Sequence, residues 1–285
     1  MSEKEAILLN GKLLSEEIEK KVAQEVNQLD GRPPTLAVII VGSNPASQIY
    51  VKRKAEACKR ASIHSRVLEF SDQIAESDLL EEINKLNLAN EVDGILIQLP
   101  LPRHIDSESI ILAIDPKKDV DGFHPINLGS LLLGQNRGFT SCTPLGIKML
   151  LAHYGIDLAG KHAVILGRSN IVGKPLAALL MQNEKGMNAT VTIANSYTQN
   201  LPRLAKEADL LVAAMGSPHF VKADWIKPGA IVVDVGISRV NGKLLGDVDP
   251  LAINQASYMT PVPGGVGPMT ISALICNTLK SRKSR

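Results

Sequence analysis

The sequence predicts an α/β protein with two α/β domains, the second of them a Rossmann-like dinucleotide-binding domain. Strand-like and helix-like segments alternate along almost the whole chain, as they do in parallel sheets with crossover helices. Hydrophobic residues make up 45% of the chain but aromatic residues only 3%, so the cores must be aliphatic, as in sheets covered by helices on both faces. The length of 285 residues is typical of two domains.

The first half of the chain contains a complete series of such segments. An amphipathic helix comes first, since Ile18, Val22 and Val26 recur at helical spacing. The expected elements are a helix at 12–29, a strand at 35–41, a helix from 45, a strand near 66–70, a helix near 76–89, a strand at 94–98 and a short helix near 107–114. Repeated β-α-β units of this kind predict a parallel sheet.

A second series begins after Cys142-Thr-Pro144. Its expected elements are a helix near 145–154, a strand at 163–166, a helix from about 174, strands near 190–194, 209–214 and 230–235, and a last helix at 269–279 that begins at Pro268. We therefore expect a first domain over 1–140, with the segment 263–285 packed back on it, and a second domain over 141–262.

Composition excludes several classes of function. Lys and Arg number 31 against 29 Asp and Glu, a balance that does not suit a nucleic-acid-binding surface. Three scattered cysteines without a Cys-x-x-Cys pair indicate a reducing compartment. No apolar run reaches the length of a membrane span, and the charged residues 1–5 precede no apolar signal region. We expect a cytoplasmic protein that binds neither nucleic acid nor membrane.

The segment from Asn44 to Lys54 carries the most distinctive polar pattern. Asn44 can cap a helix, and Pro45 suits its first turn. Ser47, Tyr50 and Lys54 then fall at i, i+3 and i+7, which places them on one face. The helix starts where a strand ends, and open α/β sheets bind their ligands there. The spacing alone is equally compatible with a solvated face on which a Tyr and a Lys align by chance.

Two other polar positions follow predicted strands. Gln98 ends the strand at 94–98, where its amide can project into the same crevice or only close the strand end. Asp119-Val-Asp-Gly122 resembles the start of a calcium loop but lacks the glycine and the glutamate that such a loop needs further on. The six histidines are dispersed without ligand spacing, so we expect no metal site.

Two glycine-containing segments indicate a dinucleotide and a flat ligand. The turn Gly167–Gly173 lies between a strand and a helix, where a pyrophosphate can rest on the helix N-terminus, although a plain strand–helix turn is the alternative. Arg168 can pair with a ribose 2′-phosphate, and the segment 195–198 lacks the acidic residue of NAD-type domains, which favours NADP. The three glycines of Pro261–Pro268 allow close approach of the backbone to a ligand.

Together these segments resemble the methylenetetrahydrofolate dehydrogenase/methenyltetrahydrofolate cyclohydrolases of one-carbon metabolism. The matching segments follow the family's order along nearly the whole chain and are 41–50 with Lys54, 94–102, 118–125, 167–175, 233–237 and 261–270. The resemblance implies two α/β domains flanking a cleft in a cytoplasmic homodimer that acts on tetrahydrofolate derivatives. It implies NADP-dependent oxidation of methylenetetrahydrofolate to the methenyl compound, followed by hydrolysis to formyltetrahydrofolate.

The resemblance also implies roles for individual residues. Lys54 would be the central acid/base residue, Tyr50 would stack on the folate, Gln98 would orient Lys54, and Asp121 would bind the pterin edge. The implied substrate-binding residues are Ser47, Tyr50, Leu99, Asp121, Pro263, Gly264, Gly267 and Pro268. The implied cofactor-binding residues are Gly167, Arg168, Ser169, Gly173, Ser196 and Ile237. The segment Ala194-Asn-Ser196 departs from the Cys-His-Ser-like stretch of many relatives, which weakens the expected contact with the 2′-phosphate there.

The two reactions differ in what they ask of these residues. Hydride transfer requires mainly alignment, whereas addition of water and ring opening require proton transfer. A lysine can serve when burial and a nearby cation favour the neutral amine. Three alternatives stay open at this point: a dehydrogenase-only relative, a non-catalytic NADP-binding regulator, and a short-chain dehydrogenase with its Tyr-x-x-x-Lys pair. Motif order opposes the last, because the dinucleotide turn here follows the pair instead of preceding it.

Overall fold

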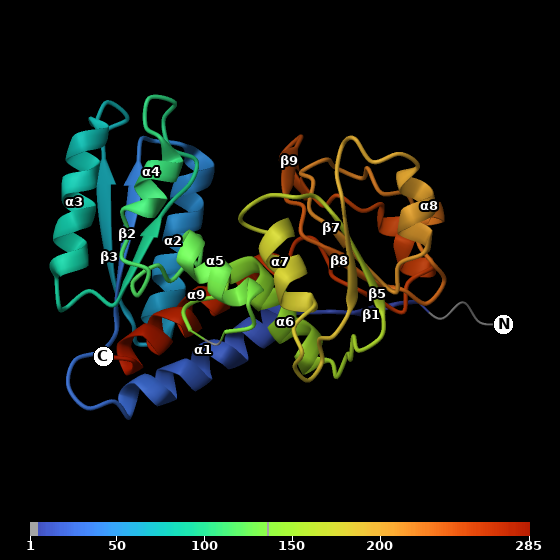
Figure 1. The fold of residues 1–285 in the computed structure, drawn as a ribbon, viewed down its shortest axis with the longest axis horizontal. Helices are drawn as coiled ribbons and strands as arrows, with labels where there is room; N and C mark the ends of the chain where they lie inside the picture. The colour runs from blue at the N-terminus through green and yellow to red at the C-terminus, as the bar shows by residue number, and fades with distance from the viewer. Residues whose placement is uncertain (1–4, 136) are drawn as a thin grey trace. The chain divides into compact units, whose positions relative to one another are not determined.

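The computed structural model describes residues 5–135 and 137–285, which separate into two compact units (Figure 1). Unit 1 comprises Thr143–Thr270 and the chain up to Ser15. Unit 2 comprises Glu16–Cys142 and Ile271–Arg285. Residues 1–4 and 136 of the expected first domain lie outside the described residues. Three helices contain the boundaries between the units: α1 (Gly11–Asn27), α6 (Cys142–His153) and α9 (Val266–Lys283).

Unit 2 is built on a three-stranded parallel sheet in the order β3-β2-β4. The strands are β2 (Thr35–Val41), β3 (His64–Phe70) and β4 (Gly94–Ile97), and Val38 of the central strand pairs with Val67 and Leu96. All seven residues of β2 are buried, as expected of a parallel strand covered on both faces.

The helices of unit 2 cover both faces of this sheet. Alternate residues of β2 pack in one core with α3 (Glu76–Leu88) and α4 (Ser107–Leu112), and the intervening residues point to the opposite face. Figure 1 shows α2 (Pro45–Arg60) on the side of β2 and β3 opposite to α3. A further helix, α5 (Pro125–Leu132), follows the turn that contains Asp121.

The C-terminal part of α9 is tied to unit 2 by buried hydrogen bonds. The Asn277 amide donates to the carbonyl oxygens of Val120 (2.8 Å) and Thr140 (3.0 Å). The Ser281 hydroxyl donates to the carbonyl of Asp93 at 2.6 Å. The end of the chain is therefore an integral part of the unit that contains β4.

Unit 1 is built on a six-stranded parallel sheet in the order β1-β11-β8-β7-β5-β6. Its strands are β1 (Ile7–Leu8), β5 (His162–Leu166), β6 (Thr190–Ala194), β7 (Leu210–Ala213), β8 (Ile231–Asp234) and β11 (Tyr258–Met259). The chain runs from β5 to β6 on one side and then returns to β7 on the other side of β5. The direction of winding thus reverses between β5 and β7, and sheets of this class bind ligands beyond the carboxyl ends of the strands at such a point.

The prediction of an α/β fold with a Rossmann-like domain is confirmed, and the differences concern short elements. The structure adds α5, α8 (Leu201–Lys206), the hairpin of β9 (Ser238–Val240) and β10 (Lys243–Leu245), the 3₁₀ turns at 223–225 and 250–254, and the two-residue strands β1 and β11. Such short strands exist because a neighbouring strand pairs with them, and no local pattern marks them. Helix α9 begins at Val266, before Pro268. Proline is tolerated at this point because the N–H groups of the first helical turn have no partner within the helix, so the missing N–H of a proline costs nothing there.

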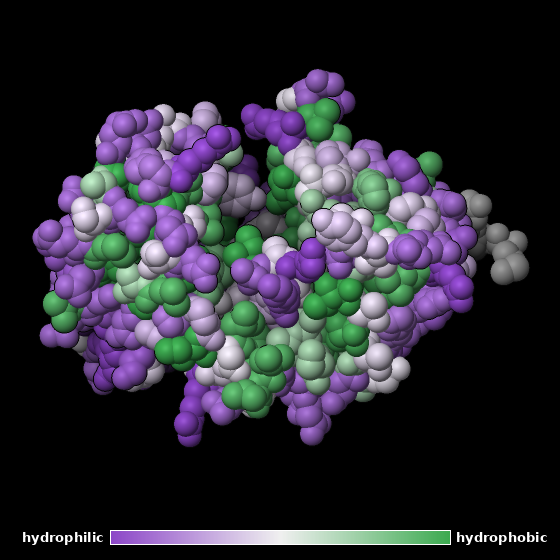
Figure 2. Space-filling view, turned by 45° about the horizontal axis from the view of Figure 1, so that its top comes forward, coloured by the Kyte–Doolittle hydropathy of each residue, from purple (hydrophilic) through white to green (hydrophobic). Residues whose placement is uncertain are grey.

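The visible face of the molecule is mostly hydrophilic (Figure 2). Figure 2 shows hydrophilic residues interspersed with smaller groups of apolar ones over the visible face. Within the described ranges, no helix is both long enough and apolar enough to span a bilayer.

Candidate active site

The beginning of α2 is fixed by the capping interaction that its sequence predicts. The Asn44 side chain accepts hydrogen bonds from the backbone N–H groups of Ala46 (3.0 Å) and Ser47 (3.2 Å). The helix therefore starts directly beyond the carboxyl end of β2, and one of its faces turns inward. Ser47 and Lys54 on this face are 6% and 8% exposed, which is unusual for a lysine. Tyr50 lies partly buried, and burial raises the pKa of its phenol against the opposing effect of Arg53.

The structure places Lys54 and Gln98 in direct contact. The Lys54 amine donates to Gln98 Oε1 at 3.1 Å. The Gln98 amide nitrogen donates to the carbonyl of Leu99 at 2.8 Å, so the amide oxygen is the atom that faces the lysine. The backbone of Gln98 continues the sheet by donating to Ile39 O at 2.8 Å. Two neighbouring strands, β2 and β4, thus position both side chains.

A buried carboxylate, Asp119, shapes the turn that carries Asp121. Asp119 is 2% exposed and accepts hydrogen bonds from the backbone of Phe123 (3.2 Å) and His124 (2.8 Å) and from the Asn127 amide (2.8 Å). Burial raises its pKa to about 6, although these hydrogen bonds act in the opposite direction. The partly buried Asp121 also has a raised pKa because of burial, opposed by the positive charge of Lys54.

Cys142 completes this cluster, and the sequence analysis did not single it out. Its backbone N–H donates to Asp121 O at 3.2 Å, and its thiol donates to Val120 O at 3.3 Å. Burial and the neighbouring Asp121 raise the pKa of the thiol well above its ordinary value, so it acts as a neutral donor. The only signal in the sequence was the Cys-Thr-Pro segment at the start of α6, which carries no chemical pattern of its own.

In unit 1 the predicted phosphate-binding turn lies at the point where the winding of the sheet reverses. Gly167 has φ +125°, and a β-carbon there would collide with the carbonyl of Ala214, which follows β7. A β-carbon on Gly173, the first residue of α7 (Gly173–Leu180), would collide with the carbonyl of Gly167. The turn therefore keeps bare backbone close to the helix N-terminus, which suits a pyrophosphate.

The side chains of this turn differ in their surroundings. Ser169 Oγ accepts from the backbone N–H groups of Val172 (3.1 Å) and Gly173 (3.4 Å) and so caps α7. The exposed Arg168 guanidinium lies 5.9 Å from the centre of the Tyr197 ring. Ser196 lies exposed in the turn after β6. Because β5 and β6 are neighbours, the loops that carry Arg168 and Ser196 leave adjacent strands of the sheet.

The last of the predicted cofactor-binding residues and four of the predicted substrate-binding residues also belong to unit 1. Ile237 is 41% exposed and follows β8. An added β-carbon on Gly267 would lie 3.4 Å from the Ile237 side chain, so the two positions are neighbours. The predicted substrate residues Pro263, Gly264, Gly267 and Pro268 therefore lie in unit 1, whereas Ser47, Tyr50, Leu99 and Asp121 lie in unit 2.

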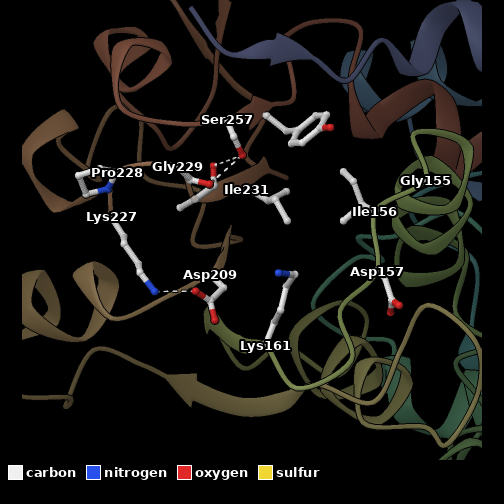
Figure 3. Close-up of a pocket in the computed structure, with 12 residues that line it drawn as sticks. Gly155, Ile156, Asp157, Lys161, Asp209, Lys227, Pro228, Gly229, Ile231 and Ser257 are labelled. Carbon is white, nitrogen blue, oxygen red and sulfur yellow. Dashed lines mark hydrogen bonds and ion pairs between the residues drawn. The ribbon is translucent and has the colours of Figure 1, made fainter. Parts of the chain in front are cut away.

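A pocket of about 300 Å³ lies at the opposite, amino edge of the sheet of unit 1 (Figure 3). Lys161, Asp209 and Lys227 contribute its charged side chains together with the exposed Asp157. Lys227 pairs with Asp209 at 2.6 Å, and Asp209 also accepts from the backbone of His162, so this carboxylate is already satisfied by the protein. None of the predicted site residues lines this pocket. In the part of the chain that the structure describes, no cluster of three or more His, Cys, Asp or Glu residues could hold a metal ion.

Comparison with known families identifies the chain. Residues 9–121 match the catalytic domain of the tetrahydrofolate dehydrogenase/cyclohydrolases, and residues 141–285 match their NAD(P)-binding domain. The chain belongs to this family.

Relatives match it over nearly the full length. The bifunctional protein FolD of Protochlamydia amoebophila is 52% identical over 283 residues, which cover 96% of this chain and 97% of the relative. The crystal structure of the bifunctional FolD from Campylobacter jejuni is 49% identical, covers 98% of this chain and 99% of its own, and superimposes with a TM-score of 0.95. The Trypanosoma brucei FolD, solved with NADP and an inhibitor, is 36% identical, covers 99% and 98%, and has a TM-score of 0.91.

The raised pKa of Asp119 predicts a pH-dependent contribution to stability. Its pKa is about 6 in the folded chain against an ordinary value of 3.8. Its stabilising contribution is therefore fully present below about pH 4 and is lost as the pH rises through about 6. Compared with Asp119→Asn, the wild-type chain should gain up to about 3 kcal/mol of unfolding free energy on going from pH 7 to pH 4.

Urea unfolding of both proteins at several pH values measures this difference in unfolding free energy. The contributions of all other titrating groups are the same in the two proteins and cancel. Between pH 7 and pH 8 the difference should stay constant. A difference that is constant down to pH 4 would contradict a raised pKa for Asp119.

Proposed function

We propose that this chain catalyses two successive reactions of one-carbon metabolism. It oxidises methylenetetrahydrofolate with NADP and then hydrolyses the methenyl product to formyltetrahydrofolate. Membership of the family over both of its domains supports this proposal, and the observation that carries it is the contact of buried Lys54 with Gln98 beside Asp121. A buried lysine held by an amide oxygen can move a proton, which a regulatory NADP-binding protein would not need.

We infer a division of labour between the expected domains. Residues 1–140 with the segment 263–285 would bind the folate and carry the catalytic groups, and residues 141–262 would bind NADP. The family models support a boundary near residue 140, since the catalytic-domain model matches 9–121 and the NAD(P)-binding model matches 141–285. The hydrogen bonds of Asn277 and Ser281 support assigning the C-terminal part of the chain to the first domain. By analogy with the family we also propose a cytoplasmic homodimer.

The oxidation step requires alignment more than acid or base. The bridging methylene loses a hydride, and the two flanking nitrogens stabilise the cation that remains. NADP supplies the hydride acceptor. Tyr50, Ser47 and Leu99 would hold the folate, with Asp121 at the pterin edge, and positioning of this kind accounts for much of the rate of a hydride transfer.

The hydrolysis step requires proton transfer, and Lys54 is our candidate for it. Water adds to the methenyl carbon and loses a proton, and a ring nitrogen gains a proton as the ring opens. The Lys54 amine donates a hydrogen bond to the Gln98 oxygen. The other bonding positions of the amine nitrogen therefore point away from Gln98. Gln98 would therefore orient Lys54 toward the substrate.

The residues of unit 1 fit NADP. The turn between Gly167 and Gly173 brings bare backbone close to the N-terminus of α7, where a pyrophosphate is commonly bound. Within the described residues, Arg168 has no carboxylate partner, and it stands at the end of β5 beside the loop that carries Ser196. A guanidinium and a hydroxyl at the ends of adjacent strands suit a ribose 2′-phosphate. Ile237 would contact the cofactor from the loop after β8.

Both activities should be present in the purified protein. Absorbance spectroscopy with methylenetetrahydrofolate and NADP should show reduced cofactor and methenyl compound, and the methenyl signal should then decay. Hydrolysis of added methenyltetrahydrofolate should not need NADP. If this hydrolysis proceeds only at the rate of the buffer, the chain is a dehydrogenase alone.

Replacement of Lys54 should separate the two reactions. Lys54→Met keeps a linear side chain but removes the proton carrier, so hydrolysis should fall by about 100- to 10,000-fold, as for other general acid/base groups. Oxidation should fall less, because it loses only alignment. Gln98→Ala should impair hydrolysis in the same direction but to a smaller extent. Both activities are to be measured on one preparation whose melting curve shows it to be folded, and intact hydrolysis in Lys54→Met would exclude Lys54 as the proton carrier.

Removal of the Arg168 charge should change the preference between cofactors. Arg168→Ala should weaken NADP binding by about 1.5–3 kcal/mol, the value of a hydrogen bond to a charged group, and should leave NAD binding almost unchanged. Arg203→Ala, at an exposed position of α8, is a matched control that should affect neither cofactor. Equal losses for NADP and NAD would show that Arg168 does not recognise the 2′-phosphate.

A further inference from the structure

Unit 1 contains two buried carboxylates that the reactions above do not use. Asp234 is 2% exposed and Asp247 is fully buried. Among the described residues, neither forms an ion pair with a lysine, arginine or histidine. Buried carboxylates are expensive unless hydrogen bonds compensate for the lost water, so the partners of these two residues indicate what they do.

Asp247 accepts hydrogen bonds from three successive backbone N–H groups. Its Oδ2 accepts from Met215 at 2.7 Å and from Gly216 at 2.9 Å, and its Oδ1 accepts from Ser217 at 2.7 Å. These amides belong to the loop directly beyond the carboxyl end of β7. One side chain thus fixes the conformation of the whole loop 215–217.

Asp234, the last residue of β8, holds Asp247 in place. Its Oδ1 accepts from the backbone N–H groups of Asp247 (2.9 Å) and Gly236 (3.0 Å), and its Oδ2 accepts from Val248 (2.9 Å). A β-carbon on Gly236 would collide with the Asp247 carboxylate, and one on Gly246 would collide with that of Asp234. The two carboxylates therefore connect the loops after β7 and β8 into one rigid assembly.

This assembly borders the predicted dinucleotide site. Strand β7 is the neighbour of β5 across the point where the winding of the sheet reverses. The backbone N–H of Ala214 donates to Leu166 O at 2.9 Å, and Gly167 packs against the carbonyl of Ala214. The loop 215–217 consequently lies beside the Gly167 turn, at the same edge of the sheet, with Asp247 behind it.

We propose that Asp247, held by Asp234, is a positioning residue for the nicotinamide half of the dinucleotide. This inference rests on the proposed use of NADP. Because Asp247 places a negative charge directly behind the three N–H groups of the loop, the loop 215–217 does not attract a phosphate. The pyrophosphate is left to the N-terminus of α7, and the loop forms the wall against which the uncharged or cationic nicotinamide end is aligned.

The test compares Asp247→Asn with Asp249→Asn. Asparagine keeps the size of the side chain but turns an N–H group toward backbone N–H groups that need an acceptor. Asp249 is the matched control, because it caps the turn at 250–254 through Leu251 and lies only two residues further on. In Asp247→Asn the KM for NADP should rise and kcat for the oxidation should fall, so that kcat/KM drops about tenfold or more, as expected from the loss of one such hydrogen bond and of the alignment that it provides.

Two further readouts separate positioning from a general structural effect. Hydrolysis of added methenyltetrahydrofolate, which needs no cofactor, should be unchanged in both variants, and calorimetry should show weaker NADP binding only for Asp247→Asn. An unchanged KM and unchanged NADP binding in folded Asp247→Asn would overturn the proposal. A parallel loss of hydrolysis would also overturn it, because it would show a general effect on the fold.

A measurement on the wild-type chain covers the case in which Asp247→Asn does not fold. Addition of NADP should shift the amide resonances of 215–217 and slow their hydrogen exchange, while those of 155–157 at the opposite edge of the sheet should not respond. If the amides of 215–217 do not respond although calorimetry shows NADP binding, the positioning role is wrong and the proposed function stands. Absence of NADP binding by the wild-type chain would overturn both.

Discussion

Buried carboxylates that accept backbone N–H groups are the interaction on which the functional loops of both units depend. Asp119 in unit 2 binds amides of the turn that leads into α5, and Asp234 and Asp247 in unit 1 bind amides of the loops after β7, β8 and β10. A loop at the end of a parallel strand has no ladder to satisfy its N–H groups, and a carboxylate with two oxygens can satisfy several of them at once. The cost of burying the charge appears in the raised pKa values of Asp119 and Asp234, both about 6.

This arrangement suits two successive reactions in which the product of the first is the substrate of the second. Oxidation depends on the alignment of two flat molecules, and rigid loops supply alignment without any transfer of a proton. Hydrolysis adds the need for one mobile proton, and the contact between Lys54 and Gln98 provides a candidate for it. The neutral Cys142 thiol beside Asp121 adds a donor to the same cluster without adding charge. Proton transfer and positioning are thus assigned to different side chains.

The longer elements and most of the candidate site could be predicted from local patterns. The cap at Asn44, the stripe of Ser47, Tyr50 and Lys54, and the end of a strand at Gln98 are properties of neighbouring residues in the chain, and the structure shows each of them. Asp234 and Asp247 could not be found in this way. Their partners lie up to 32 residues away, and an aspartate in a loop has the same local appearance whether it binds water or three buried amides.

The sequence by itself determined the α/β class, the alternation of strands and helices, and the family, because period, capping and motif order are encoded in short segments. Only the tertiary structure decided the order of the six strands in unit 1, with β1 and β11 at one edge, and the return of α9 to unit 2 through Asn277 and Ser281. It also decided which polar side chains meet. Such contacts join residues that are distant in the chain. They stabilise the protein only after the strands between them have paired and water has been excluded.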